Sequence, residues 1–404
     1  MRLFDTRALW IATALFAVAG GAAAQSVTSI SGLGYPIAQS DARAESLDGI
    51  GVAVKGLAVP FTNPASVARA TRRGVVVSAV ATEWDSSLGD LSGSSGATRF
   101  PLIRVIFPMR GVVLTGGYGA FLDQAWSVER EGTHTLSTGP VTFRDQFTSV
   151  GGVGQARLGA AIPLGDRWAV GVSIGMYTGR QDLGLTRRYD NDSASIGTLQ
   201  AYSETRAVQY SGTVAQVGVQ WDPAEVVRVG GSVTWSGTLT ADSTVGQVTT
   251  REYDLPLQVA AGASAYLAPS LLASVSGRWS GWGGTDPSGG LMETRGTVSS
   301  RDTWELGAGL ELDDPERRTL YSFPLRAGFQ YRQLPFTFVG DNAPTEWLAS
   351  VGAGLRMGAD FNTPVARIDL TVQRGARTAS GSGSTPDLEE TLWRFVLGVS
   401  IFGT

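Results

Sequence analysis

The sequence predicts an all-β fold, a transmembrane antiparallel β-barrel of about fourteen strands with an N-terminal plug in its lumen. Residues 388–402 alternate along their length, so that Trp393, Phe395 and Leu397 fall on one face and Arg394 and Gly398 on the other. A period of two residues is that of a strand with one apolar face. The composition agrees with a barrel, because 53 Gly, 17% charged residues and a mean hydropathy near zero result when lipid-facing and lumen-facing residues cancel.

The N-terminus has the layout of a cleaved secretory signal. Arg2 and Arg7 flank the start of an apolar stretch at 8–19, and small residues follow up to position 24. After these residues, no apolar run is long enough for a membrane helix. We therefore assign residues 1–24 to a signal peptide, 25–73 to a plug or hatch and 74–404 to the barrel, and we expect export to the bacterial outer membrane.

Composition argues against several other classes of protein. The chain has no Cys, which rules out a disulfide scaffold and thiolate metal sites. Its net charge is −4 and its Arg residues are spread without a cluster, so we expect no nucleic-acid partner. Residues 171–175 match the hydrolase pattern Gly-x-Ser-x-Gly, but they lie within a predicted strand, and the sole histidine, His134, is far from Ser173 in sequence. We expect no enzyme activity, no metal and no cofactor.

Strand candidates recur between alternating short and long connections. An even number of strands places both termini on the periplasmic side. The fourteen predicted strands are 74–83, 99–107, 111–123, 141–163, 168–177, 203–221, 227–236, 250–267, 271–282, 298–312, 323–334, 345–358, 365–375 and 388–402.

The connections divide into two sets. Short segments rich in turn formers are assigned to the periplasm: 108–110, 165–167, 222–225, 268–270, 313–322 and 360–364. Mostly longer segments rich in Gly, Ser, Thr and Asp are assigned to extracellular loops: 84–98, 124–140, 178–202, 237–249, 283–297, 335–344 and 376–387.

One face of the later strands carries charge, which predicts a polar lumen. In 365–375, for example, Ile368 and Leu370 oppose Arg367 and Asp369. These side chains would select polar solutes in an open pore, or would equally anchor the plug through ion pairs. The predicted lumen-lining polar residues are Arg326, Gln330, Arg332, Arg356, Arg367 and Asp369.

The segment before the barrel does not show a strand repeat. Asn63 as N-cap with Pro64 at the first helical position predicts a short helix through about Ala70, and we assign Asn63, Pro64 and Ala65 to the hatch. A segment of this length in front of a barrel is most simply a plug inside it. The alternative is a disordered periplasmic tail.

Several short motifs in this order resemble the FadL/TodX family of outer-membrane transporters for fatty acids and other hydrophobic compounds. They are Ser31-Gly32-Leu33-Gly34, Asn63-Pro64-Ala65, Ile162-Pro163, Leu255-Pro256 and Arg326–Tyr331 followed by Pro335. The resemblance implies a fourteen-stranded barrel with an N-terminal hatch. Segment 178–202 departs from the family, because it has few apolar residues for a lipid-binding groove. The last residue is Thr404, so the signal for the barrel-assembly machinery would use Phe402.

Glycines interrupt two neighbouring predicted strands. Such paired interruptions indicate a bulge or a break in the ladder, and the resemblance implies a lateral exit for substrate at a kink in the third strand. The alternative is that these glycines relieve curvature or make room for the plug. The predicted lateral gate consists of Gly116, Gly117, Gly119, Gly151, Gly152 and Gly154.

The sequence and the resemblance together predict a channel for passive uptake of hydrophobic, fatty-acid-like molecules. Its expected partners are the outer-membrane bilayer, a hydrophobic small-molecule ligand and the barrel-assembly machinery. Two alternatives stay open: a general diffusion porin for small polar solutes, and a non-transporting barrel that acts as a scaffold for a secretion or attachment system.

Overall fold

The computed structural model describes most of the barrel and the plug. It covers residues 29, 32–56, 60–89, 91–136, 139–189, 200–243, 249–286, 299–313, 321–337, 342–358, 365–381 and 387–403. The predicted signal peptide, 1–24, lies outside the described residues, as do the predicted turn 360–364 and the centres of several predicted loops.

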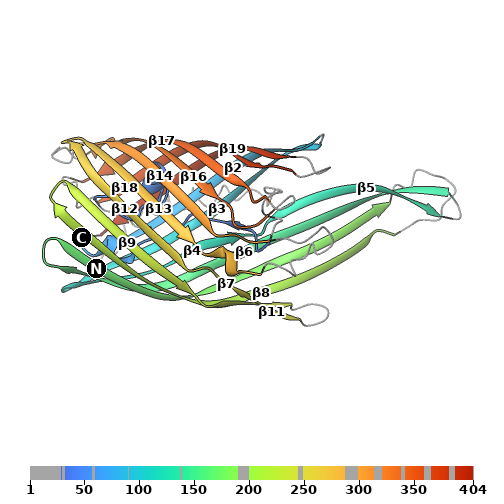
Figure 1. Cartoon of the computed structure of the whole chain (residues 1–404), viewed down its shortest axis with the longest axis horizontal. Helices are drawn as coiled ribbons and strands as arrows, with labels where there is room; N and C mark the ends of the chain where they lie inside the picture. Colours follow the sequence, from blue (N-terminus) through green and yellow to red (C-terminus); the bar gives the residue numbers. More distant parts are fainter. Residues whose placement is uncertain are drawn as a thin grey trace.

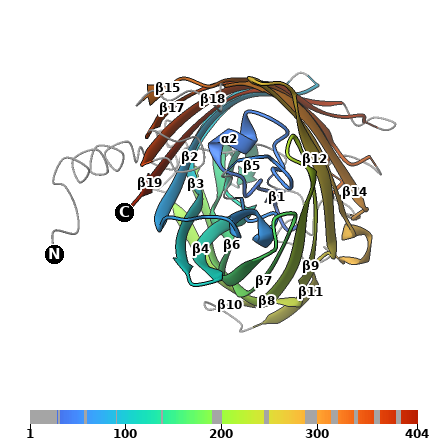
Figure 2. The same cartoon turned by 90° about the vertical axis from the view of Figure 1, so that its left-hand side faces the viewer.

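Fourteen antiparallel strands form a closed barrel, as predicted (Figures 1 and 2). The ring closes where β19 pairs with β2, from Leu388 opposite Leu88 to Phe402 opposite Gly74. The wall strands are β2 (Gly74–Leu88), β3 (Leu91–Met109), β4 (Val112–Asp123), β6 (Gly139–Leu164), β7 (Trp168–Tyr189), β8 (Tyr202–Ala224), β9 (Val227–Ser236), β12 (Gln258–Ala268), β13 (Leu271–Ser280), β14 (Thr303–Leu312), β16 (Leu325–Gln333), β17 (Thr345–Met357), β18 (Ala366–Ala379) and β19 (Leu388–Phe402).

The outer surface of the barrel carries an apolar band. Along β7, Trp168, Val172 and Met176 are exposed on the outer face, and Arg180 is exposed further along the same face. Nine residues at about 3.3 Å each, on a tilted strand, match an apolar band roughly 25 Å tall. Trp168 stacks on Trp221 at the periplasmic border of this band, with ring centroids 5.3 Å apart, where amphipathic rings are favoured.

Three predicted extracellular loops are largely strand. Within 84–98, β2 continues to Leu88 and β3 begins at Leu91, directly opposite it. The predicted loop 124–140 contains β5 (Trp126–Leu136), which pairs with β6. Strand β7 continues to Tyr189, well into the predicted loop 178–202. The result is a sheet of β5, β6, β7 and β8 that extends beyond the rest of the barrel (Figure 1). The loop assignment was wrong because these strand segments lie in water on both faces. They are therefore polar throughout and lack the two-residue alternation by which strands were predicted.

A smaller correction concerns the predicted loop 237–249 and the predicted strand 250–267. Strand β10 (Thr238–Ser243) pairs with β8, and β11 (Thr250–Asp254) pairs with β10. Residues 255–257 then separate β11 from β12. A short strand β15 (Tyr321–Ser322) pairs with β17.

The segment before β2 lies within the ring of strands (Figure 2). It contains strand β1 (Tyr35–Pro36), helix α2 (Ala42–Glu45) and a 3-10 turn η2 (Pro64–Val67). No helix in the described part of the chain is long and apolar enough to cross a membrane. Small wall residues admit this plug, because a Cβ on Gly171 would lie 2.6 Å from the backbone nitrogen of Ala65, and one on Gly218 would lie 2.2 Å from Oδ1 of Asn63.

We predict that Gly218→Val displaces the plug from β8. The added side chain occupies the space of Asn63 and Pro64, so trypsin should cleave faster than in the wild type after Lys55, which lies in the plug segment that Asn63 holds through the carbonyl oxygen of Val52. Gly231→Val is the matched control, since its Cβ would meet only the carbonyl oxygen of Ala260, at 3.5 Å. Peptide mass spectrometry after limited proteolysis measures the effect, and equal cleavage of both variants would contradict this account.

Candidate functional site

Asn63 connects the plug to the barrel wall. Its Nδ2 donates to the carbonyl oxygens of Val52, at 2.9 Å, and of Val219 in β8, at 3.1 Å, while its Oδ1 accepts from the backbone nitrogen of Ala65, at 2.9 Å. The side chain is fully buried. One amide group therefore caps η2, orders the preceding plug backbone and holds both against β8.

A chain of buried ion pairs holds α2 against the opposite wall. Arg43 contacts Glu311 at 2.6 Å, and Arg326 bridges from Glu311, at 2.6 Å, to Asp369, at 2.7 Å. Arg367 contacts both Asp369, at 2.6 Å, and Asp41, the N-cap residue of α2, at 3.5 Å. Three arginines and three carboxylates alternate, which keeps these buried charges compensated. In order, the members of this ion-pair chain are Asp41, Arg367, Asp369, Arg326, Glu311 and Arg43.

A second polar cluster holds β1. The hydroxyl of Tyr35 donates to Glu346 at 2.9 Å, and Glu346 also accepts from Arg332 and Arg377. Arg377 reaches Glu390 at 3.1 Å, and its guanidinium lies 4.1 Å from the centroid of the Tyr35 ring. The plug is thus attached at β1 as well as at α2.

The structure brings most of the predicted lumen-lining residues into these attachments. Arg326, Arg367 and Asp369 belong to the ion-pair chain, and Arg332 belongs to the Tyr35 cluster. Gln330 donates to the carbonyl oxygen of Glu45 in α2, at 3.2 Å. Arg356 lies apart from them, near the periplasmic end of β17, where it contacts Asp313 at 2.9 Å. Their partners Glu311 and Glu346 were not among the predicted lumen-lining residues, although both are charged residues in alternating strands.

Two of the predicted gate glycines contact the plug. A Cβ on Gly119 would lie 2.7 Å from the ring of Phe61, and one on Gly117 would lie 3.0 Å from it. The guanidinium groups of Arg104 and Arg157 lie over the Phe61 ring, 5.3 Å and 5.5 Å from its centroid. These glycines therefore admit a plug aromatic beside β4.

Of the other gate glycines, Gly116, Gly154 and Gly152 lie within the β4–β6 ladder, which ends at Gly152, and Gly151 lies just beyond its end. Gly116 is opposite Leu158, and a Cβ on Gly154 would collide with the hydroxyl of Tyr118. A Cβ on Gly152 would lie 2.3 Å from the carbonyl oxygen of Leu122, and Gly151 has a φ of +125°, which favours glycine. Strands β4 and β6 pair from Val113–Ala161 to Asp123–Gly152, with one register shift near Phe121. This edge of β4 has a bulge.

The wall changes partners on the other edge of β4. Pairing between β3 and β4 runs from Met109–Val112 to Leu102–Gly119, and β3 continues beside β2 as far as Leu91. Beyond Gly119, β4 pairs with β1 of the plug. Ile37 donates to the carbonyl oxygen of Phe121 at 2.9 Å. We call this place the β3–β4 divergence.

A cavity between the plug and the wall adjoins the β3–β4 divergence. It is bordered by Ile37 of the plug and by Val80 and Pro101 of the wall, and Arg332 and Arg394 also line it. Pro101 immediately precedes Leu102, where the pairing of β3 with β4 ends, and it has no backbone N–H to donate. The plug, not β3, therefore covers this part of β4.

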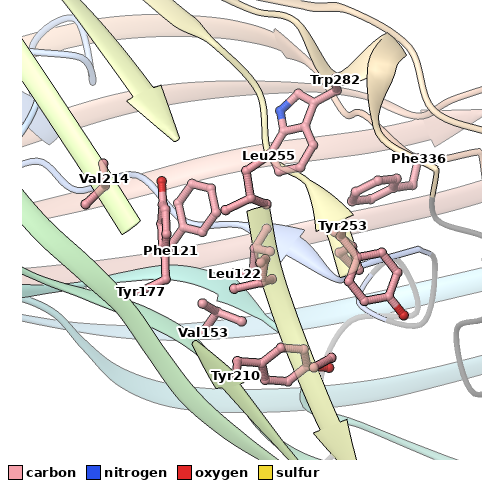
Figure 3. Packing of buried hydrophobic residues seen from close by; sticks show 13 residues of the cluster. Phe121, Leu122, Val153, Tyr177, Tyr210, Val214, Tyr253, Leu255, Trp282 and Phe336 are labelled. Atoms are coloured by element: carbon pink, nitrogen blue, oxygen red, sulfur yellow. The ribbon is translucent and has the colours of Figure 1, made fainter. Parts of the chain in front are cut away.

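An aromatic cluster occupies the lumen where the strands leave the apolar band (Figure 3). The ring of Phe121 lies 4.8 Å from Tyr177 and 6.1 Å from Trp282, which in turn lies 5.4 Å from Phe336. Tyrosine hydroxyls at its border are satisfied, since Tyr210 donates to Gln181 at 2.8 Å. Sequence reasoning missed this cluster because Phe336 lies in a predicted loop and Trp282 at a predicted strand end.

The residues of the hydrolase pattern are not assembled into a catalytic arrangement. Ser173 lies within β7, opposite Gln216, and the strand continues without a turn. His134 lies in β5, where its ring stacks on Phe143 at 4.5 Å. The structure therefore places the serine at the level of the plug and the histidine in the extended sheet.

The fold is that of the FadL/TodX-type transmembrane barrels. Similar solved structures are a Pseudomonas aeruginosa FadL homologue (12% identity, TM-score 0.60), the Ralstonia pickettii toluene transporter TbuX (16%, 0.56) and the Pseudomonas putida toluene transporter TodX (13%, 0.56). Each match covers 91% of this chain and 98–99% of the other. The resemblance inferred from sequence is confirmed at the level of the fold.

A comparison of the sequence with family models gives a second result. Residues 6–256, more than half of the chain, match the family model described as BamG. The chain belongs to the BamG family. None of the curated proteins compared with it matches.

We predict that Glu311→Gln weakens the barrel much more than Glu131→Gln. Glutamine at 311 leaves Arg43 and Arg326 buried without their shared carboxylate, which should lower the free energy of unfolding by about 3–5 kcal/mol. Glu131 contacts Arg144 with more than half of each side chain exposed, so its loss should change this energy by less than about 1 kcal/mol. Urea titration of the refolded variants measures both, and similar midpoints would contradict the role of the ion-pair chain.

We also predict a pH dependence from Glu45, which belongs to the plug and not to a membrane-spanning strand. Burial raises its pKa to about 7, although the charge of Arg394 opposes this shift. The folded state binds the proton more tightly, so stability is gained as pH falls from about 7 toward the unfolded value of 4.5. Glu45→Gln should therefore raise the thermal midpoint at pH 8 and leave it unchanged at pH 4. A gain that persists at pH 4 would count against this assignment.

Proposed function

We propose that the protein is an outer-membrane channel for the passive uptake of hydrophobic small molecules. In this proposal the N-terminal plug is a hatch, and substrate leaves sideways at the β3–β4 divergence. The observation that carries the proposal is the exchange of partners on β4, where plug strand β1 takes the edge that β3 leaves. Movement of β1 would uncover a strand edge and the cavity beside it.

The lumen offers a route of suitable chemistry toward that exit. The aromatic cluster around Phe121 and Trp282 supplies an apolar entry site on the extracellular side. Phe121 lies on β4 next to the residues that pair with β1, so the entry site and the divergence share one strand. Lateral release into the bilayer means that an apolar molecule does not have to cross water. Transfer of its apolar surface from water into the bilayer contributes a favourable free energy of about 25 cal/mol per Å². A concentration gradient then suffices without a nucleotide.

Structural neighbours support the class of substrate. TodX and TbuX are toluene transporters, and CymD, which has a TM-score of 0.53, is a monoaromatic hydrocarbon channel. In this chain much of segment 178–202 belongs to polar strands, which offers little surface for a long acyl chain. Toluene is therefore a suitable first probe for transport, and a fatty acid is the second.

A non-transporting scaffold is the second candidate function. The buried ion-pair chain favours it, because the N-cap and the first turn of α2 are held at Asp41 and Arg43 by compensated charges that resist plug movement. A general porin is disfavoured for the same reason. The two candidates differ in whether the β1–β4 contact ever opens.

We predict that a disulfide between β1 and β4 stops uptake. Pro36 and Leu122 are direct partners in the β1–β4 pairing, and paired residues of antiparallel strands have Cα separations of about 4.5–5.5 Å, which suit a disulfide. The chain has no native Cys. The double variant Pro36→Cys/Leu122→Cys, oxidised in the membrane, should reduce toluene uptake at least tenfold, and a reducing agent should restore it.

The matched control is Val233→Cys/Val259→Cys. This pair joins β9 to β12 on the outer face, away from the plug, so oxidation should leave uptake unchanged. Uptake that is unaffected by the β1–β4 disulfide would exclude exit at the divergence. Absence of toluene and fatty-acid uptake in the reduced protein, with an intact barrel, would favour the scaffold.

A further inference from the structure

Among the residues that the structure describes, the tip of β3 presents an open strand edge on the extracellular side. Residues 92–98 pair with β2 on one side, from Ser92 opposite Ser87 to Thr98 opposite Ala81. The pairing of β3 with β4 stops before this segment, at Leu102. Outward-facing Glu83 and Asp85 on the neighbouring β2 are exposed, which places this part of the hairpin above the apolar band.

This edge lacks the protection that other strand edges of the protein have. Residues 92–98 read Ser-Gly-Ser-Ser-Gly-Ala-Thr, without a charge or a proline. By contrast, β5 carries Glu129, Arg130 and Glu131 in succession, and the tip of β8 carries Glu204 and Arg206. Charged residues on an edge prevent pairing with other chains, whereas a long uncharged edge invites it.

The chemistry of the edge specifies its occupant. In an antiparallel pair, alternate residues direct both backbone groups toward one partner, so the others direct theirs toward the open side. Donors and acceptors repeated every second residue over about 20 Å are all satisfied together only by another extended strand. The small side chains leave room for large ones on the incoming strand, since a Cβ on Gly93 would meet nothing within 4 Å.

A second copy of this chain does not fit the edge. Two copies in one membrane are related by an axis along the membrane normal, so both β3 strands run from the tip toward the bilayer. Their edges cannot pair antiparallel, and the tilt of barrel strands makes them cross. The occupant must come from a different chain at the cell surface.

We propose that residues 92–98 of β3 bind an extended, uncharged segment of a separate cell-surface protein by β-strand addition. The incoming strand continues the β2–β3 hairpin above the β3–β4 divergence. Backbone pairing supplies most of the binding, and large side chains at alternate positions of the partner pack over the small residues of β3. This binding does not depend on transport, so the disulfide experiment and the one below can fail separately.

Hydrogen–deuterium exchange tests the proposal on the full chain in three samples. These are outer membranes from the cells that make the protein, the purified protein in detergent, and the purified protein returned to vesicles of extracted outer-membrane lipid. In the native membranes, the open-edge amides of 92–98 should exchange at least about tenfold more slowly than in detergent. In the lipid vesicles they should exchange as fast as in detergent.

Two comparisons make the result decisive. The variant Ser94→Lys/Gly96→Lys should lose the protection in native membranes, while Ser203→Lys on β8 should keep it. Residues 305–312 of β14, which pair on both edges, should exchange equally in all samples. Equal exchange of 92–98 in native membranes and in detergent would overturn the proposal, and protection in lipid vesicles would show that lipid covers the edge instead of a protein.

Discussion

Continuity of backbone pairing around the ring is the constraint on which this structure depends. In hydrocarbon an unpaired N–H or C=O costs several kcal/mol, so a barrel wall must close on itself. Here closure is complete between β19 and β2 across all fifteen residues of β2, and the partner exchange on β4 occurs only where the plug supplies a strand. The plug thus has two roles, since it fills the lumen and also completes the pairing of β4.

The plug contacts the inside of the barrel in two ways: through ion pairs on one side, and through glycines that leave space for it on the other. Toward β14, β16 and β18, arginines and carboxylates alternate from α2 into the wall. Toward β7 and β8, glycines in the wall leave the space that Asn63 and Pro64 occupy. A buried charge held by two partners is costly to separate from them, whereas a glycine in the wall only leaves space for the plug and adds no attraction. In the described residues, the plug therefore meets β7 and β8 through glycine contacts and the amide of Asn63, whereas the ion-pair chain holds it on the side of β14, β16 and β18.

Much of the wall could be predicted from sequence, because a two-residue period reports directly which face of a strand is buried. The predicted limits of 227–236 and 388–402 equal those of β9 and β19. Strands beyond the membrane lack this signal, so β5 and β10 were taken for loops. Partners across the lumen were also hidden, since nothing in the sequence relates Arg43 to Glu311 before the register of fourteen strands is known. The glycines beside β4 were noticed, but their contact with Phe61 depends on how the plug folds.

The seam between β2 and β19 has a consequence for the order of assembly. The plug joins the wall at Arg73, whose carbonyl oxygen accepts from the nitrogen of Gly403 next to the closing pair. A folded plug has no route into a finished cylinder other than through its ends, yet its anchors come from strands made late in synthesis. The N-terminal segment must therefore be enclosed as the last strands fold around it. The plug is a template for closure, and a chain that loses it should close slowly or in a wrong register.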